Sequence, residues 1–492
     1  MEAWVKAIND WVWSTPLIVL CLGAGLYFSL RTRFVQVRQV REMLRLLLTD
    51  NRSEAGVSSF QALAMSLSGR VGIGNIAGVA TAIAYGGPGA VFWMWVVAFL
   101  GASTAYVEST LGQIYKEKDS EGRYRGGPAY YIEKATGQKW YGWLFAITTV
   151  VACGLLLPGV QANGIADGLK NAWKIPPEMT ATVVVVLLGF IIFGGVKRIA
   201  RVAEVVVPFM ALAYILVALV IMLLNADKLP AMWLLIIKSA FASEAAFGAM
   251  VGQAIAWGVK RGIYSNEAGQ GTGPHAAAAA EVSHPAKQGL VQAFSVYVDT
   301  LLVCSATAFM MLSTGTYNVI ERSQNAAGET VERLLVENLP GVNVGPGFAQ
   351  NAVESVLPGY GAGFVALALL FFAFTTIMAY YYMAETNVTF LTRGKHSTVL
   401  IFALRLLLLA AVTFGAVRTA DMAWAIGDIG VGLMAWLNII AILLIQRPAL
   451  VALRDYEKQK KAGIAEPSFD PDALGIKHAD FWRRRKAKQH AD

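Results

Sequence analysis

The sequence predicts an all-α integral membrane protein with about eleven transmembrane helices. The first observation is composition: of 492 residues, 56% are hydrophobic and only 15% are charged, whereas an average soluble domain is about one quarter charged. The second is that apolar runs approaching the roughly 20 residues needed to cross a bilayer recur along the whole chain. Together they exclude an ordinary soluble enzyme, a disordered regulator and a secreted disulfide scaffold.

Polar or glycine-rich breaks divide these apolar runs into eleven predicted spans. They cover residues 11–30, 56–85, 89–114, 140–168, 179–196, 203–224, 233–257, 287–312, 358–391, 398–416 and 422–445. The first run lacks a basic flank before it and is followed by Arg31 and Arg33, so we expect a helix rather than a cleaved signal peptide. The spans predict one transmembrane domain at 1–445, followed by a basic tail at 446–492.

Positive charge is distributed unequally between the two sets of loops. Of 41 Lys and Arg residues, 31 fall in the tail and the loops on its side, and seven fall in the opposite loops. Because positive loops stay in the cytoplasm, this asymmetry predicts an external N-terminus and a cytoplasmic C-terminus in the plasma (inner) membrane. The net charge of +8 therefore reflects topology and gives no reason to expect a nucleic-acid partner. The outer loop 313–357 is expected to contain a short helix.

Two of the spans are interrupted near their midpoints. The second span contains Gly69-Arg70-Val71-Gly72-Ile73-Gly74-Asn75, and the seventh contains Ser243-Glu244-Ala245-Ala246-Phe247-Gly248-Ala249-Met250. A helix can break within a membrane only where protein or water covers the freed backbone groups. Because five spans separate the starts of these two, the second would be an inverted copy of the first. Two such breaks point to a transporter's binding site; the alternative is a GxxxG packing face made by Gly74 and Gly78.

Four motifs carry a family resemblance over nearly the whole chain. They are Gly72-Ile73-Gly74-Asn75-Ile76-Ala77-Gly78, Gly86-Gly87-Pro88-Gly89, Arg125-Gly126-Gly127-Pro128-Ala129-Tyr130-Tyr131 and Asn266-Glu267-Ala268-Gly269-Gln270-Gly271-Thr272-Gly273-Pro274. In this order they resemble the alanine or glycine:cation symporter family, the sodium:alanine symporters. The resemblance implies a leucine-transporter-type fold. Two inverted five-helix repeats (about 56–224, spans 2–6, and about 233–445, spans 7–11) would follow one extra N-terminal helix.

The resemblance also implies what is carried and where it binds. The substrate would be a small neutral amino acid, alanine and/or glycine, imported with Na⁺ as the coupling ion and without an organic cofactor. Its carboxylate would lie at the amides of Ile73, Gly74 and Asn75, which the unwinding argument selects as well. Gln161 would reach the substrate, or else form only an interhelical hydrogen bond.

A pocket wall and a sodium site complete the set of expected ligands. Phe247, Gly248 and Met250 would enclose the substrate side chain, unless they serve only in helix packing. By the resemblance, Na⁺ would bind five oxygens, contributed by the carbonyls of Ser68, Val71 and Phe372 and the hydroxyls of Thr375 and Thr376. The alternative for the two threonines is that they hydrogen-bond only to their own helix.

Arg70 departs from the pattern of related transporters, which often have a small or hydroxyl residue there beside a second Na⁺ site. A guanidinium at the bilayer midplane needs a partner, and Glu244 at the second predicted break is the candidate. We expect an Arg70–Glu244 pair to replace the second cation and to pin the two broken helices together.

Two other functions compete with sodium-coupled import. One is a proton-coupled carrier of the same fold, and the other is a non-transporting amino-acid sensor. The sequence has no Walker phosphate loop and no recognisable catalytic cluster, which argues against an ATP-driven pump and an enzyme. The expected partners are the amino acid, Na⁺ and the lipid bilayer.

Overall fold

The computed structural model describes residues 2–47, 56–241, 250–324, 330–393, 395 and 397–489, most of them in helices. The first half of the chain forms α1 (Glu2–Val12), α2 (Thr15–Arg31), α3 (Val35–Arg38), α4 (Val40–Leu47), α5 (Ser59–Arg70), η1 (Gly74–Gly78), α6 (Val79–Gly86), α7 (Gly89–Ile114), β1 (Glu117–Lys118), β2 (Tyr124–Arg125), α8 (Pro128–Thr136), α9 (Lys139–Val151), η2 (Ala152–Leu156), α10 (Leu157–Trp173), α11 (Pro177–Ile192), α12 (Val196–Leu224), η3 (Ala226–Lys228) and α13 (Leu229–Ala240). The second half forms α14 (Val251–Asn266), α15 (Gly273–Ala279), α16 (Pro285–Val296), η5 (Tyr297–Cys304), α17 (Ser305–Thr314), β3 (Asn318–Gln324), β4 (Thr330–Glu337), α18 (Pro346–Glu354), α19 (Gly361–Thr392), α20 (Ser397–Ala416), α21 (Ala420–Ile445), α22 (Arg447–Lys461) and α23 (Asp480–Gln489).

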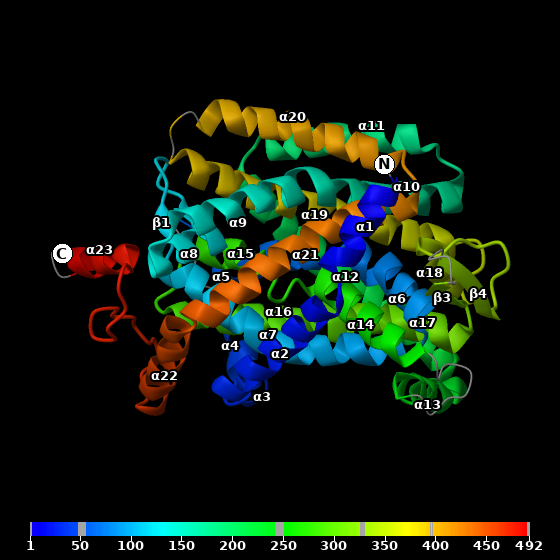
Figure 1. Ribbon diagram of the computed structural model, residues 1–492, viewed down its shortest axis with the longest axis horizontal. Coiled ribbons are helices and arrows are strands. Elements are labelled where there is room, and N and C mark those ends of the chain that lie inside the picture. Colours follow the sequence, from blue (N-terminus) through cyan, green and yellow to red (C-terminus); the bar gives the residue numbers. More distant parts are fainter. Residues whose placement is uncertain are drawn as a thin grey trace.

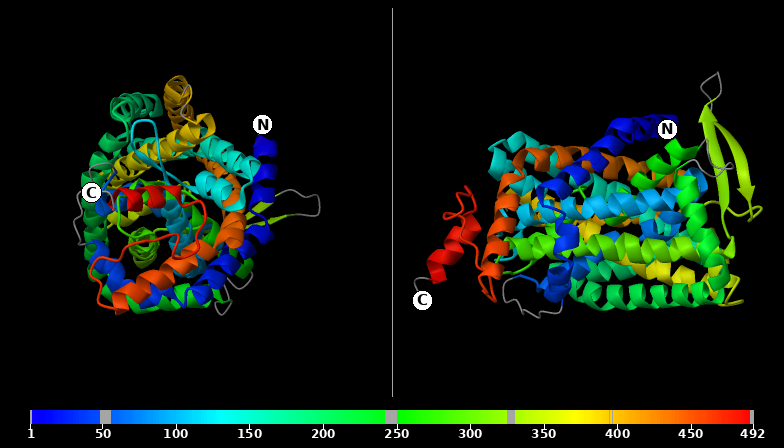
Figure 2. Two further views of the ribbon diagram at one scale, coloured as in Figure 1. Left: turned by 90° about the vertical axis from the view of Figure 1, so that its left-hand side faces the viewer. Right: turned by 90° about the horizontal axis from the view of Figure 1, so that it is seen from below.

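The long helices run side by side along the longest axis of the molecule (Figure 1). The two ends of this bundle differ. One end, which we call the basic end, carries α8, α15, α22 and α23; the other, the hairpin end, carries α18 and the antiparallel pair β3–β4 (Figures 1 and 2). The tail therefore lies at the end where the positively charged loops were expected to gather.

Eight helices of the described chain are long and apolar enough to cross a membrane, or nine when the bent pair α5 and η1–α6 is counted as one span. Most predicted boundaries fall within a few residues of a helix end, and the span predicted at 89–114 coincides with α7. The fifth predicted span corresponds to α11, a shorter apolar helix. These helices confirm a multi-pass helical membrane protein.

Small residues allow the central helices to pack closely. Gly258 and Gly262 form a GxxxG step on α14, and a Cβ at these positions would lie 2.6 Å from the Ala90 carbonyl oxygen and 2.4 Å from Val97 Cγ1 of α7. Lipid tails are as apolar as the side chains of these helices, so the hydrophobic effect does not drive the helices together. Close packing of the backbones stabilises helix pairs in membranes instead. Helix α14 is thereby fixed against α7.

The loop at 313–357 and the tail at 446–492 contain more structure than the sequence suggested. The short helix expected within 313–357 is present as α18, and it is preceded by the β3–β4 hairpin, which was not predicted. The tail expected at 446–492 forms α22 and α23 and packs across the basic end (Figure 2, left).

Candidate functional site

The first break lies where the glycines predicted it. Helix α5 ends at Arg70, a π-helical turn covers Gly74–Gly78, and the two half-helices are bent by 51°. The amides freed by this bend are taken up by side chains: Gly72 N–H donates to Asn75 Oδ1 at 2.8 Å, and Ile73 N–H donates to Gln161 Oε1 at 3.0 Å. All of these residues are buried. The structure thus brings Ile73, Asn75 and Gln161 together at one unwound segment.

Close packing explains why glycine occurs at Gly72. A Cβ there would lie 2.5 Å from Thr376 Oγ1 and 2.9 Å from Gln161 Oε1, so any larger residue would displace one of these groups. At Gly74 the nearest atom would be Tyr264 Cδ1 at 3.2 Å, and at Gly78 the nearest would be 3.6 Å away. The tight contact is therefore at the break itself, and the proposed Gly74/Gly78 packing face has room at its second position.

Oxygen atoms converge where the sodium site was expected. Thr376 Oγ1 lies 2.7 Å from the Ser68 carbonyl oxygen, 3.4 Å from that of Val71 and 2.9 Å from that of Phe372. Thr375 Oγ1 lies 2.9 Å from the Phe372 carbonyl oxygen and 3.0 Å from that of Phe371, both of which belong to its own helix, α19. Hard cations such as Na⁺ take ligands of this kind. The structure therefore joins the end of α5 to the middle of α19 through the Thr376 hydroxyl, whereas the Thr375 hydroxyl stays within α19.

The second break in the described chain lies outside the predicted seventh span. Helix α14 continues to Asn266, past the predicted end at residue 257, and α15 begins only at Gly273. Between them Glu267, Gly269 and Gly271 have positive φ angles of 57°, 86° and 87°, and every residue of the turn is buried. The predicted end of the seventh span at residue 257 was therefore wrong, because polar residues that face protein resemble a loop in the sequence.

Of the site residues predicted on the seventh span, the structure describes only Met250. Glu244, Phe247 and Gly248 lie outside the described residues. Met250 is described and buried, and it directly precedes α14. It lies 14 residues before Tyr264, the α14 residue that faces Gly74, which is about 21 Å at 1.5 Å per helical residue. The structure does not bring Met250 to the unwound segment.

Arg70 is buried at the first break, as expected, and faces the second. Its Nη1 donates to the Gln292 carbonyl oxygen at 3.1 Å and to the Ser295 hydroxyl, both on α16. Its Nε and Nη2 donate to no group of the described chain. The guanidinium lies in the electrostatic field of Glu267, Glu108 and Asp299. The expected partner Glu244 cannot be compared, because it lies outside the described residues.

Glu108 holds the second break in place, a role the sequence reasoning missed. Its carboxylate accepts the amide N–H groups of Gly269 and Gly271, each at 3.2 Å, and the side-chain amide of Asn438 at 2.7 Å. Glu267, in the same turn, accepts a hydrogen bond from the Thr272 hydroxyl at 2.8 Å, and its Oε1 has no described partner. Two features of the sequence could have indicated this contact: Glu108 is an acid inside the apolar span 89–114, and the motif at 266–274 is rich in glycine.

Asp299 ties the first break to the second. It lies in the π-helical segment η5, where its carboxylate accepts hydrogen bonds from Asn75 Nδ2 at 2.6 Å, Ser265 Oγ at 3.0 Å and Thr300 Oγ1 at 2.7 Å. None of these donors is a cation. Among the described residues, the Arg70 guanidinium therefore lies in the field of three buried carboxylates, those of Glu108, Glu267 and Asp299. Buried charges of this kind require compensation.

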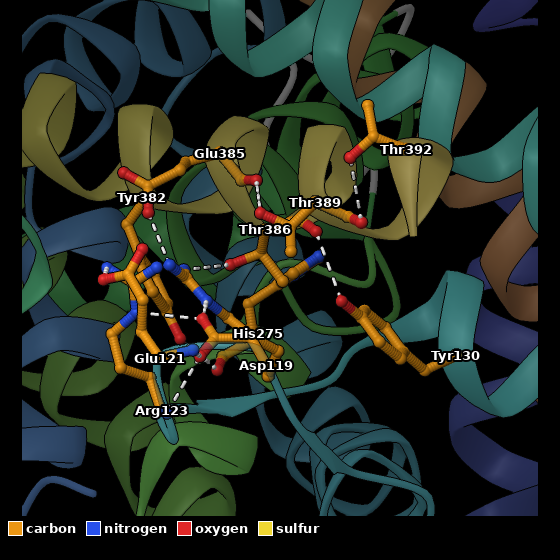
Figure 3. A network of polar contacts seen from close by, with 11 residues as sticks. Asp119, Glu121, Arg123, Tyr130, His275, Tyr382, Glu385, Thr386, Thr389 and Thr392 are labelled. Carbon is orange, nitrogen blue, oxygen red and sulfur yellow. Dashed lines mark hydrogen bonds and ion pairs between the residues drawn. The ribbon is translucent and has the colours of Figure 1, made fainter. Parts of the chain in front are cut away.

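A polar network lies at the basic end, and Figure 3 labels its residues His275, Glu385 and Thr386 among neighbouring polar side chains. Arg125 of β2 forms an ion pair with Glu385 of α19 and donates to Thr386 Oγ1 at 3.1 Å. Nearby, the side chains of Asn387 (α19) and His275 (α15) lie 2.8 Å apart. These contacts connect the β1–β2 hairpin and α15 to α19. We call these five residues the inner network.

Toward the hairpin end, two cations expected in a loop instead lie within α14. Lys260 and Arg261 both pair with Asp428 of α21, Lys260 at 2.8 Å. The Arg261 guanidinium also lies 4.5 Å from the Trp424 ring, a favourable cation–π distance. This pairing satisfies charges that the loop count had assigned to the cytoplasmic side.

Known proteins match this chain over most of its length. The family model described as the sodium:alanine symporter family matches residues 1–471. YrbD of Bacillus subtilis is 62% identical over 484 residues, covering 98% of both chains. The sodium/proton-dependent alanine carrier protein of Bacillus sp. (strain PS3) is 54% identical, covering 89% of this chain and 97% of that protein.

The chain is also similar to solved structures. The manganese transporter of Eremococcus coleocola, in complex with an aromatic bis-isothiourea substituted compound, aligns with a TM-score of 0.48 and 12% identity, over 83% of this chain and 89% of that one. The family model and the two relatives, which agree with the helical membrane fold, establish the classification. The chain belongs to the sodium:alanine symporter family, and it is a multi-pass membrane transporter rather than an enzyme.

Proposed function

We propose that this protein imports small neutral amino acids, alanine and/or glycine, in symport with Na⁺ by alternating access. The observation that carries the proposal is the convergence of Ser68, Val71 and Phe372 carbonyl oxygens on the Thr376 hydroxyl. A Na⁺ ion bound there would draw the unwound end of α5 against α19. Cation binding would thereby order the segment that holds the amino acid.

The substrate site in this proposal is the unwound segment Ile73–Asn75 with Gln161. The freed amides and the N-terminal end of the outer half-helix suit a carboxylate, and Gln161 would exchange its bond to Ile73 N–H for one to the substrate. The close contacts at Gly72 and Gly74 leave little room around this backbone, which favours a small side chain. The name of the Bacillus sp. (strain PS3) relative supports alanine.

The two helix breaks also support an inverted repeat. Helix α5 approaches its break from the basic end, whereas α14 approaches its own from the hairpin end (Figure 1). The two halves would be about 56–224 and 233–445, within one transmembrane domain at 1–445. In the plasma membrane, the N-terminus would lie outside and the tail at 446–492 would lie in the cytoplasm. Glu267–Thr272 would then replace 243–250 as the counterpart of the first break.

Charge balance supports coupling to a cation. Among the described residues, three buried carboxylates (Glu108, Glu267 and Asp299) face the single guanidinium of Arg70, so an added Na⁺ or a proton would reduce the excess of negative charge around Arg70. The buried carboxylate of Asp299, whose described hydrogen-bond donors Asn75, Ser265 and Thr300 are all neutral, favours a proton-coupled carrier as the second candidate function. The relative from Bacillus sp. (strain PS3) is named for both ions.

Counterflow in proteoliposomes tests the proposal. Liposomes loaded with unlabelled alanine are diluted into labelled alanine, with Na⁺ or choline at fixed pH, and a panel of small L- and D-amino acids competes. The expected result is Na⁺-dependent exchange of alanine with competition only from small neutral amino acids. Exchange that is unaffected by choline replacement but depends on pH would support the proton-coupled alternative, and no exchange with any amino acid would refute transport.

A further inference from the structure

The C-terminal tail of this protein contacts the basic end of the membrane domain along both of its helices, α22 and α23. Helix α22 is held at the basic end by Glu457, which pairs with Arg33 and Arg38, each at 2.8 Å. Asp455 of the same helix lies 3.2 Å from His284 Nε2 at the start of α16. From this anchor the chain crosses the basic end to α23, which lies over the centre of the helix bundle (Figure 2, left).

Two aromatic side chains of α23 are buried in the membrane domain. Trp482 is 3% exposed and its Nε1 donates to the Gln113 carbonyl oxygen at 2.9 Å, at the end of α7. Phe481 is 6% exposed and packs edge-on against Tyr124 of β2, with ring centroids 5.1 Å apart. Side chains this large and this buried contribute substantially to binding. The end of the tail is therefore docked and not merely solvated.

A buried lysine links the docked rings to the membrane domain. Lys116 is fully buried, its Nζ lies 4.3 Å from the Tyr124 ring and 4.6 Å from the Phe481 ring, and it donates to the Ala280 carbonyl oxygen at 2.7 Å. Burial lowers the pKa of the Lys116 ammonium well below its usual value. Removing the rings of the tail would expose the Lys116 ammonium to water. The burial of Lys116 therefore depends on the docked tail.

The docked rings support the same hairpin that closes the basic end. Tyr124 and Arg125 are neighbours on β2, and Arg125 reaches Glu385 in the inner network. On the other side of the hairpin, Arg485 of α23 donates to the Val282 carbonyl oxygen at 2.6 Å, in the turn between α15 and α16. The tail thus contacts both the hairpin and the α15–α16 turn, which together hold the inner network against α19.

We infer that the tail is a latch: docking of Phe481 and Trp482 holds the β1–β2 hairpin down and keeps the basic end of the transport path closed. This inference rests on the proposed alternating-access function, because a latch acts only where that end opens. Release of α23 would free the hairpin and with it the Arg125–Glu385 pair.

A cysteine beneath the hairpin tests the latch. Thr386 is buried and accepts a hydrogen bond from Arg125, so Thr386→Cys places a thiol of similar size where only an open basic end exposes it. The labelling rate by a membrane-impermeant thiol reagent is measured on the full-length protein. Labelling of the chain without this substitution, whose three cysteines are buried, gives the background.

Adding Trp482→Ala to the Thr386→Cys variant should raise its labelling rate about tenfold, and Trp482→Phe, which keeps a ring but loses the bond to Gln113, should give a smaller increase. Arg484→Ala is the matched control, because Arg484 is exposed on the same helix; it should leave the rate unchanged. Equal rates for Trp482→Ala and Arg484→Ala, in folded samples with similar unfolding temperatures, would overturn the latch.

The same samples separate failure of the latch from failure of transport. Labelling needs no transport, so faster labelling in Trp482→Ala supports the latch whatever the substrate. If the rate rises but neither Na⁺ nor alanine supports counterflow, the latch stands and the proposed function fails. If counterflow is normal and Na⁺-dependent while the tail variants leave labelling unchanged, the latch fails and the proposed function stands.

Discussion

At the scale of single residues, the neighbouring threonines Thr375 and Thr376 make different contacts: the Thr376 hydroxyl reaches another helix, and the Thr375 hydroxyl does not. Both threonines were expected to bind Na⁺, yet only the Thr376 hydroxyl reaches the carbonyl oxygens of the broken helix. The Thr375 hydroxyl contacts carbonyl oxygens of its own helix. The two side chains therefore make a matched pair for mutagenesis.

Thr376→Val should raise the Na⁺ concentration for half-maximal alanine uptake by about ten- to a hundredfold. The change removes one oxygen and keeps the side-chain shape, and a lost buried polar contact costs about 1–3 kcal/mol. Thr375→Val should change this concentration less. Uptake into proteoliposomes over a Na⁺ series measures both, and equal effects of the two variants would contradict the assignment.

Gly72→Ala should lower alanine transport at least tenfold, whereas Gly78→Ala should be tolerated. A Cβ at position 72 meets Thr376 and Gln161 below 3 Å, while at position 78 its nearest neighbour lies 3.6 Å away. Overpacking of this kind typically costs about 1–3 kcal/mol. Initial uptake rates, compared at equal amounts of protein in the membrane, check the prediction; a larger loss for Gly78→Ala would show that helix packing at 74 and 78 matters more.

At the scale of helices, the first break could be predicted and the second could not. Three glycines and a cation inside an apolar run have few explanations other than an unwound span, and the break was found there. The turn at Glu267–Thr272 is polar because it is covered by Glu108 and Asn438 from distant helices. Hydropathy records exposure to lipid, so a polar segment buried by protein reads as a loop.

Helix α16 provides a pH-dependent contact between the membrane domain and the tail. His284 caps this helix by accepting the Ala286 N–H at Nδ1, 3.1 Å away, while Asp455 and the Tyr456 ring of α22 and Lys287 of α16 face it. Burial lowers the pKa of His284 below its usual 6.5, more than Asp455 raises it. The neutral form therefore belongs to the folded state.

Because the unfolded chain takes up the proton more readily, the stability that His284 contributes is full above about pH 6.5 and declines as the pH falls below that value. The unfolding temperature of the detergent-solubilised protein should therefore drop between pH 7.5 and 5.5 by more than that of His284→Asn. Asparagine is a good N-cap and does not titrate. Parallel pH profiles for the two proteins would rule out this histidine as the sensitive group.

At the scale of the whole molecule, the sequence predicted the architecture more completely than the site. Long apolar runs and asymmetric loop charge are properties that lipid imposes on a chain, so the helices and the basic end followed from them. The contacts of Arg70, Glu108 and Asp299 depend on how helices far apart in sequence meet, which periodicity does not record. The β3–β4 hairpin was missed because its alternation lies within one polar loop.

Arg70→Ala should reduce transport strongly, because the cluster around the breaks would lose the guanidinium among its three carboxylates. The variant leaves more uncompensated negative charge at membrane depth, where a charge costs several kcal/mol. Arg333→Ala, on the exposed strand β4, is the control and should transport normally. Unchanged uptake and unchanged Na⁺ dependence in Arg70→Ala would contradict a role for this residue in charge balance.

The central claim is that a Na⁺ gradient drives amino-acid entry through the broken-helix site. Uptake of labelled alanine into proteoliposomes, with Na⁺ outside only and equal pH on both sides, tests it most directly. We predict accumulation above the equilibrium level that collapses when choline replaces Na⁺. Accumulation that persists in choline and follows an imposed pH gradient instead would contradict sodium coupling.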